Sequence, residues 1–460
     1  MTTILQIMTL SFRLHFSLLL VVSTFNHITL AQTGPMFQGT SGHSGYYSDT
    51  MPTSFGSPLW KLKTKGKIFS SPVMADDVLY VGSEDGFLYA INASTGTVKW
   101  KFKTRRAVHS TPSVYGNMVY FGSFDGHYYG VDIRTGKMKW RFKTGGEKWQ
   151  GGRGYLGLKP DTLMMDDPWE YFLSSPIVQE IDGIPVVFFG SSDSHVYAVD
   201  ALDGKLAWKF KTGDIVHTTP AFDDDNLYIG SWDTFMYALN KRTGKELWRF
   251  KTGDQIGMSG IQASPTVYEG KLYFGARDAH FYALNTGKGE LLWKYAAENA
   301  WILSTAAIDR DNLYVGTSDS YLLLAINATN GKEVWRSKLK GYVFSSPAVT
   351  RNAVYIADFT GNVYAIRKSD GKIQDTFSTE GRLKNGPKIL TTEDRMDFMK
   401  LAAGKDLSQY RVNMDVMREL YKLGSIVSSA LIQKNMLYVG SADGMLYAIP
   451  LTETPAAAQP

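Results

Sequence analysis

A tryptophan followed by a short cationic segment recurs at nearly constant spacing along this chain. The segments read WKLKT, WKFKT or WRFKT, and successive tryptophans are separated by 40, 40, 68, 40, 45 and 42 residues. The seven tryptophans are Trp60, Trp100, Trp140, Trp208, Trp248, Trp293 and Trp335. A unit of about 40 residues has the length of one four-stranded propeller blade, so the sequence predicts a repeat protein.

One unit, read from Trp208 to Trp248, contains short apolar runs separated by turn residues. The runs are WKFKT, IVHTTPAF, LYIGS and MYALN, and this spacing predicts antiparallel strands joined by tight turns. From Trp100 onward a glycine stands four residues before each tryptophan. We expect this glycine to supply the positive φ of a hairpin turn and to have no other role.

The number of units predicts how the propeller closes. After the seventh tryptophan the spacing predicts one more strand of this type at Asp375, with Phe377 on the same strand face. The last unit, residues 426–449, lacks an outer strand, and the unmatched strand at Trp60 could supply it. We therefore predict an all-β fold, an eight-bladed β-propeller of four-stranded antiparallel blades over residues 58–450, closed by its N-terminal strand.

Two insertions interrupt the repeat. The first, about 145–172 in blade 3, contains GGRGYLG and several aromatic residues, and we expect an ordered loop over one face. The second, about 378–424 in blade 8, has apolar residues at helical spacing and predicts two short helices against a propeller face. A binding role and a packing or spacer role both remain open for each insertion.

The remaining segments lie at the two ends of the chain. Residues 1–31 read as a signal peptide, with an apolar run too short for a membrane span and a cleavage point after Ala31. Residues 32–57 form a leader, and 451–460 a flexible tail. We expect an exported protein, periplasmic or extracellular, without a transmembrane segment.

Composition excludes several kinds of chemistry. The chain has no cysteine, which rules out disulfides, thiolate metal sites and a cysteine nucleophile. The net charge is only +5, and the lysines are spread over all blades, which favours a solvated rim over a nucleic-acid surface.

An aspartate recurs at the same turn in seven blades, and Thr360 takes its place in the remaining one. Because aspartate at a tight turn caps backbone amides, we expect a structural role and no metal site. These residues are Asp85, Asp125, Asp193, Asp233, Asp278, Asp319 and Asp443.

A hydroxyl residue also recurs, at the start of each inner strand. These residues are Ser71, Thr111, Ser175, Thr219, Ser264, Thr305, Ser346 and Ser429. They form a polar collar around the channel or are small residues required where eight strands crowd together. His109 and His217 stand just before this collar and are candidate ligands or acid–base groups, or else structural residues.

Large side chains that break the repeat are the remaining site candidates. Trp232, Arg277 and Trp301 are single large intrusions into otherwise repeated turns and loops, and could stack on and anchor a ligand. The first insertion adds Trp149, Arg153 and Trp169. With the two histidines, these residues are predicted to form a ligand-binding funnel face, and no catalytic residue is identified.

Units such as GSEDGFLYAINASTGTVKW and GSWDTFMYALNKRTGKELW resemble the pyrroloquinoline quinone (PQQ) repeat, found in quinoprotein dehydrogenases and in the outer-membrane assembly factor BamB. The resemblance covers about residues 58–450. The leader MFQGTSGHSGYY resembles the segment before the first blade in exported bacterial propellers of this group. DPWEYFLSSP and GARDAHFYAL resemble a BamB-like subfamily.

Two function classes follow from this resemblance. The preferred one is an exported, noncatalytic binding scaffold without a cofactor, expected to be a monomer, that binds a protein or cell-envelope ligand. The alternative is a quinoprotein oxidoreductase with PQQ and calcium. For that class the resemblance implies a calcium site of Glu, Asn and Asp, a catalytic Asp and a vicinal disulfide. The disulfide is impossible here, and none of the other residues can be assigned to a position in this sequence.

Overall fold

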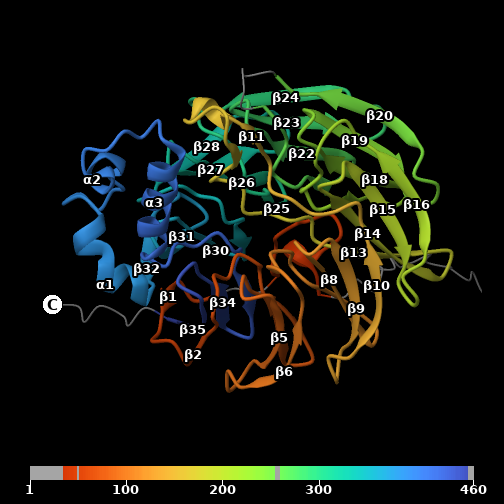
Figure 1. Ribbon diagram of the computed structural model, residues 1–460, viewed down its shortest axis with the longest axis horizontal. Coiled ribbons are helices and arrows are strands. Elements are labelled where there is room, and N and C mark those ends of the chain that lie inside the picture. Colours follow the sequence, from red (N-terminus) through yellow and green to blue (C-terminus); the bar gives the residue numbers. More distant parts are fainter. Residues whose placement is uncertain (1–34, 49–50, 254–258, 454–460) are drawn as a thin grey trace, which may run out of the picture. The chain divides into compact units, whose positions relative to one another are not determined.

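The computed structural model describes residues 35–48, 51–253 and 259–453. Eight antiparallel sheets are arranged as blades around a central channel (Figure 1). In blades 1 to 7 four strands follow chain order from the channel to the rim, whereas in blade 8 the N-terminal strands β1 (Ser54–Phe55) and β2 (Trp60–Lys63) pair with the last strand. The predicted eight-bladed propeller is therefore confirmed. The helices of the described segments are all too short or too polar to span a bilayer. The predicted signal peptide lies outside the described residues.

The blades are numbered along the chain. Blades 1 and 2 consist of β3 (Val73–Ala75), β4 (Val78–Gly82), β5 (Phe87–Asn92), β6 (Val98–Lys103), β7 (Ser113–Tyr115), β8 (Met118–Ser123), β9 (His127–Asp132) and β10 (Met138–Lys143). Blades 3 and 4 consist of β13 (Ile177–Ile181), β14 (Ile184–Ser191), β15 (His195–Asp200), β16 (Leu206–Lys211), β17 (Ala221–Phe222), β18 (Asn226–Gly230), β19 (Phe235–Asn240) and β20 (Glu246–Lys251). Blades 5 and 6 consist of β21 (Thr266–Tyr268), β22 (Lys271–Gly275), β23 (His280–Asn285), β24 (Leu291–Ala296), β25 (Ala307–Asp309), β26 (Asn312–Gly316), β27 (Leu322–Asn327) and β28 (Glu333–Lys338). Blades 7 and 8 consist of β29 (Ala348–Val349), β30 (Ala353–Ala357), β31 (Asn362–Arg367), β32 (Ile373–Ser378), β33 (Leu431–Gln433), β34 (Met436–Gly440) and β35 (Met445–Thr452).

The N-terminal strand completes blade 8, as predicted. β2 (Trp60–Lys63) pairs antiparallel with β35, with Trp60 opposite Ala448. A second short strand, β1 (Ser54–Phe55), pairs with the far end of β35, where Ser54 lies opposite Thr452. β35 thus extends two residues past the predicted end of the propeller at residue 450, and β2 covers the outer edge that β35 would otherwise expose.

Each tryptophan lies in the outermost strand of a blade, so a unit read from tryptophan begins one strand too early. Trp208, for example, lies in β16, the last strand of blade 3. The repeat length fixes the size of the unit but not where one sheet ends and the next begins. In blade 7 the equivalent residue is Asp375, which lies opposite Ala365 as Trp100 lies opposite Ala90.

The tryptophans connect neighbouring blades. Each indole N–H donates to a backbone carbonyl of the next blade, at 2.8 to 3.1 Å. The turn glycine of that next blade lies against the indole: a Cβ on Gly136, where φ is +65°, would come within 2.6 Å of the Trp100 ring. The expectation that the glycine serves the turn alone is therefore wrong, since the glycine also makes room for the tryptophan of the preceding blade.

Both insertions connect an outermost strand to the next innermost strand and therefore emerge at the same end of the channel. The first contains the paired strands β11 (Gly151–Arg153) and β12 (Met164–Asp166) with the short helix η2 (Tyr155–Gly157). The second contains α1 (Glu380–Ile389), α2 (Phe398–Ala402) and α3 (Tyr410–Tyr421). Backbone hydrogen bonds join Lys159 to Ser408 and Tyr410. The two insertions thus meet on one face, which we call the insertion face.

The second insertion has three helices, not the predicted two. The additional helix, α1, begins after Thr379, whose hydroxyl oxygen accepts the backbone N–H of Arg382 at 3.2 Å. Its sequence, EGRLKNGPKI, is polar and contains Pro387, so it lacks the apolar spacing from which helices were predicted.

The leader lies inside the channel, deeper than the collar. Its backbone carbonyls accept N–H groups from the innermost strands of blades 2, 4, 5, 6 and 7, in each case from the residue three positions after the collar hydroxyl. The pairs are Val114 to Pro35, Phe222 to Ser41, Val267 to Gly42, Ile308 to Ser44 and Val349 to Gly45, at 2.8 to 3.0 Å. The leader, which contains the short helix η1 (Phe37–Gly39), therefore forms a plug that satisfies inner-strand backbone groups.

Candidate functional site

The collar hydroxyls link the blades around the channel. Seven of the eight hydroxyls accept a hydrogen bond from the backbone N–H of the collar residue in the preceding blade, and the bond from Ser429 N–H to Ser71 Oγ, at 2.9 Å, joins the last blade to the first. The other donor–acceptor pairs are Ser71–Thr111, Thr111–Ser175, Ser175–Thr219, Thr219–Ser264, Thr305–Ser346 and Ser346–Ser429, at 2.8 to 3.3 Å. The polar collar therefore forms, and its oxygens serve blade-to-blade hydrogen bonding.

Little space remains inside the channel at this level. The collar encloses a chamber of about 30 Å³, with Phe37 of the leader and His109 and His217 among its lining residues. A chamber of this size holds about one or two water molecules.

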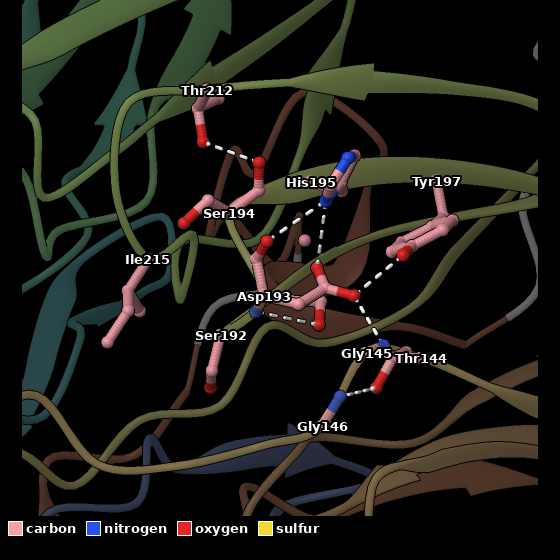
Figure 2. A network of polar contacts seen from close by, with 12 residues as sticks. Thr144, Gly145, Gly146, Ser192, Asp193, Ser194, His195, Tyr197, Thr212 and Ile215 are labelled. Carbon is pink, nitrogen blue, oxygen red and sulfur yellow. Dashed lines mark hydrogen bonds and ion pairs between the residues drawn. The ribbon is translucent and has the colours of Figure 1, made fainter.

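Six of the seven turn aspartates cap loops, as predicted; Asp319 is the exception. Figure 2 shows Asp193, whose Oδ2 accepts the backbone N–H of Gly145 at 2.5 Å and the hydroxyl of Tyr197 at 2.6 Å. A tyrosine four residues after the aspartate makes the same contact in blades 1, 2, 4 and 5. In blade 7, where Thr360 takes the aspartate position, Asp358 accepts the Thr360 N–H and the Tyr364 hydroxyl.

Burial and the hydrogen bond to aspartate both raise the pKa of these tyrosines, so their hydroxyls remain donors. Within the described ranges, no three Asp, Glu or His side chains converge in a way that could hold a metal ion.

The first insertion places three carboxylates in the channel mouth. Glu147, Asp167 and Glu170 are only 6%, 3% and 3% exposed. Glu147 Oε2 accepts the backbone N–H and the hydroxyl of Ser192, both at 2.8 Å, and the Ser192 hydroxyl contacts His217 Nε2 at 2.7 Å. His217 Nδ1 in turn lies 3.3 Å from Glu170 Oε1. The insertion is therefore held by a buried polar network, and we call residues 147–173 the lid.

Arg277 is the central cation of this mouth. Its guanidinium carbon lies 4.4 Å from the ring centroid of Trp232 and 4.3 Å from that of Trp301. Its Nη1 is 2.7 Å from Asp167 Oδ2, with both side chains fully buried, and its Nε donates to Gln262 Oε1 at 2.9 Å. The three repeat-breaking residues thus lie together, but they contact one another and a lid carboxylate, which is the pairing that a buried charge requires.

His109 belongs to a second polar group at the mouth. Its Nδ1 lies 2.8 Å from the carbonyl oxygen of Tyr171 in the lid, and its Nε2 lies 3.4 Å from Glu84 Oε1. Lys67 Nζ contacts the other oxygen of Glu84 at 2.7 Å. Burial alone would raise the pKa of Glu84. Hydrogen bonding to His109 and the charges of His109 and Lys67 outweigh burial and lower this pKa to about 2. Both predicted histidines therefore contact the lid.

The aromatic residues of the lid pack on different blades. Trp149 stacks on Phe124 with 4.1 Å between ring centroids. Trp169 packs against Tyr342 and Phe344 in the connection from blade 6 to blade 7 and against Phe398 of α2. Arg153, in contrast, is exposed on β11 and lines neither the chamber nor the aromatic pocket described next.

An open pocket of about 280 Å³ lies beside the lid. Besides Trp169, its lining comes from three loops at the insertion end: the β24–β25 connection, the β26–β27 turn and the β28–β29 connection. The lining residues are Trp169, Asn299, Trp301, Ser318, Asp319, Tyr342 and Phe344. We call this cavity the aromatic pocket.

The family model described as "Outer membrane protein assembly factor BamB" matches residues 53–164, 192–320 and 297–456. The chain belongs to this BamB family. No curated protein matches the sequence.

Solved structures resemble this BamB-family chain in fold. BamB from Moraxella catarrhalis has a TM-score of 0.62 and 15% identity, covering 86% of this chain and 99% of that one. A quinohemoprotein alcohol dehydrogenase from Comamonas testosteroni has a TM-score of 0.66 and 12% identity, covering 93% and 82%. The computationally designed Ika8 protein has a TM-score of 0.61 and 14% identity, covering 86% and 100%. Because BamB and the dehydrogenase are similar to the same degree, the shared architecture does not decide between binding and catalysis.

Five residues of the aromatic pocket were not among the sequence candidates: Asn299, Ser318, Asp319, Tyr342 and Phe344. Asp319 falls at the repeated turn position and therefore looked like a capping aspartate. Tyr342 and Phe344 lie in YVFSSP, where the repeat gives no sign that two rings turn toward one pocket. The sequence signal that could have set Asp319 apart is the length of the blade 6 turn, which is one residue longer than in other blades. With this extra residue, no tyrosine stands at the strand position from which it contacts the aspartate in other blades.

Proposed function

We propose that this chain is an exported, noncatalytic scaffold that binds a protein partner of the cell envelope on its insertion face. The observation that carries the proposal is the contrast between the chamber of about 30 Å³ inside the channel and the aromatic pocket of about 280 Å³ open at its mouth. The leader fills the channel from within, and the lid covers it. The aromatic pocket lies on the outer side of this closure and is open to a ligand.

Exposed apolar side chains on both insertions support a protein partner. Met164 of the first insertion is 65% exposed, and Leu383 and Met399 of the second are 69% and 66% exposed. Methionine and leucine on one face, next to aromatic rings, are typical of a protein-binding surface. The description of the family as an assembly factor agrees with such a role.

The alternative, a quinoprotein oxidoreductase, fits these residues poorly. A pocket for an organic cofactor usually measures about 300 to 1,000 Å³, an order of magnitude above the chamber. Six or more oxygen ligands would have to converge for calcium, whereas the turn aspartates contact backbone amides and tyrosines. His217 and Arg277 face carboxylates of the lid, and His109 faces Glu84 of blade 1.

Site-specific photo-crosslinking in the envelope of the native host tests the proposal. A photoreactive residue at Met399 on the insertion face is expected to give a discrete crosslinked product. The matched control is Leu291, 46% exposed on the outer strand β24 and away from the insertions in the chain. The same products from both positions, or a product from residue 291 alone, would contradict a partner on the insertion face.

A further inference from the structure

Asp319 differs from the turn aspartates of the other blades. In blades 1 to 5 the aspartate accepts a tyrosine hydroxyl from the residue four positions later. In blade 6 the turn has one extra residue, so that β27 begins three positions after Asp319 instead of two, and Leu324 stands at the strand position of the tyrosine. The Asp319 carboxylate is exposed, and its one hydrogen bond among the described residues comes from the Ser318 hydroxyl at 2.6 Å.

Nearby cations do not neutralise Asp319. No Lys, Arg or His nitrogen of the described ranges lies within 4.0 Å of its carboxylate. Lys338, the cation beside this turn, donates to the Ser320 carbonyl at 2.6 Å and lies 5.0 Å from the centroid of the Tyr321 ring. The Asp319 carboxylate in the wall of the aromatic pocket therefore neither caps a turn nor pairs with a cation of the described residues.

Four aromatic rings surround the space beside this carboxylate: Trp169, Trp301, Tyr342 and Phe344. The faces of aromatic rings carry negative electrostatic potential and attract cations, with tryptophan the strongest. The same mouth already contains one such arrangement, in which the Arg277 guanidinium lies between Trp232 and Trp301 beside Asp167. The aromatic pocket offers equivalent groups, rings and one carboxylate, to a cation from outside the chain.

We propose that the aromatic pocket binds the side chain of an arginine presented by the partner protein; this inference rests on the proposed function. A guanidinium is planar, stacks on rings and forms two parallel hydrogen bonds to a carboxylate, so it uses both kinds of group in the pocket. A cavity of about 280 Å³ admits one long side chain with part of its backbone. Arginine is also enriched at the anchor positions of protein interfaces.

The test uses the purified mature protein and two small probes, N-acetyl-arginine amide and N-acetyl-citrulline amide. Citrulline has nearly the shape of arginine but carries no charge. Ligand-detected NMR titration is expected to give arginine binding about tenfold tighter than citrulline binding, from the cation–ring and charge-assisted contacts. Equal affinity for the two probes would overturn the inference.

Two variants locate the binding. Asp319→Asn is expected to reduce arginine affinity to the citrulline level and to leave citrulline affinity unchanged. Asp311→Asn makes the same charge change at an exposed position at the opposite end of blade 6, and is expected to bind both probes like wild type. Asp319→Asn binding arginine like wild type would place the site elsewhere. Choline binding more tightly than arginine would point to a lipid headgroup and would also overturn the proposal.

Crosslinking separates failure of this inference from failure of the proposed function. If wild type shows no arginine preference but residue 399 still crosslinks a partner, the arginine site is wrong and the scaffold function stands. If arginine binds through Asp319 but the insertion face crosslinks nothing, the cation pocket exists and the proposed protein partner is wrong.

Discussion

The buried pair of Asp167 and Arg277 is the contact whose removal should open the lid most specifically. Replacing Asp167 with asparagine preserves the side-chain shape and the Oδ1 acceptor, which receives the backbone N–H of Trp169 at 2.9 Å. The substitution removes the charge opposite Arg277, at 2.7 Å from its Nη1, and puts an amide N–H donor in place of the Oδ2 acceptor. Arg277 itself has no exposed surface, so its guanidinium cannot reach water while the lid is closed.

The magnitude follows from this burial. Removing one partner of a buried ion pair costs about 3 to 5 kcal/mol, because the remaining charge is left uncompensated. The contacts of Arg277 with Trp232, Trp301 and Gln262 persist, so we expect the lower value, about 3 kcal/mol. Because the strain is relieved when the lid opens, that cost should raise the equilibrium constant for local opening by about 100-fold.

Hydrogen exchange followed by mass spectrometry measures this opening. Peptides covering residues 147–173 in Asp167→Asn should exchange about 100-fold faster than in wild type, while peptides of blade 4 keep their rates. The matched control, Asp166→Asn, removes an exposed carboxylate from the neighbouring position and should leave the lid unchanged. In the double variant Arg277→Met/Asp167→Asn, the lid peptides should exchange more slowly than the sum of the effects of the two single substitutions predicts. Equal exchange in Asp167→Asn and Asp166→Asn would refute the argument that this pair holds the lid.

Three further results are expected. Gly136→Ala should lower the free energy of unfolding, measured by urea denaturation, by more than Gly116→Ala does. Both glycines have positive φ, but only at Gly136 would a Cβ meet an indole. Equal losses would argue against the tryptophan contact. Burial lowers the pKa of His43 to about 4, below its usual 6.5. The neutral ring therefore stabilises the leader above pH 6.5, and this contribution is lost as the pH falls toward 4. His43→Asn, which can still donate to the Pro265 carbonyl, should flatten the dependence of the free energy of unfolding on pH in this window. Thr111→Val should cost about 1 to 3 kcal/mol in the same urea assay, because the buried N–H of Ser71 loses its acceptor, and an unchanged midpoint would show that the collar hydroxyls do not bind the blades together.

The sequence predicted the architecture because one contact repeats in seven of the eight blades. The tryptophan of each outer strand needs a partner strand and a glycine turn at fixed distances, and these appear directly as the spacing of about 40 residues. The closing strand at Trp60 was predicted for the same reason, since it carries the repeated motif without the rest of its blade.

The leader plug left no such signal. Its hydrogen bonds to five blades use backbone carbonyls, which are the same in every sequence, and glycines such as Gly42 and Gly45 offer no side-chain pattern. Helix α1 escaped prediction because its stability comes from capping and contact with the propeller rather than from an apolar stripe.

The candidate site was predicted in part for a related reason. Trp232, Arg277 and Trp301 stood out because they break the repeat, and they do lie together at the mouth. Their partner Asp167 comes from the insertion, where no repeat gives a reference position. Asp319 was assigned the capping role of its equivalents, because the extra residue that changes its contacts lies in the turn after it.

Titration of the mature protein with PQQ in the presence of calcium, followed by calorimetry and absorbance, tests the central claim most directly. A channel closed by the leader and the lid, with a chamber of about 30 Å³, predicts no saturable heat and no spectral shift. One-to-one binding in the micromolar range or tighter would contradict the account. It would show that the lid opens to admit the cofactor and would favour the oxidoreductase.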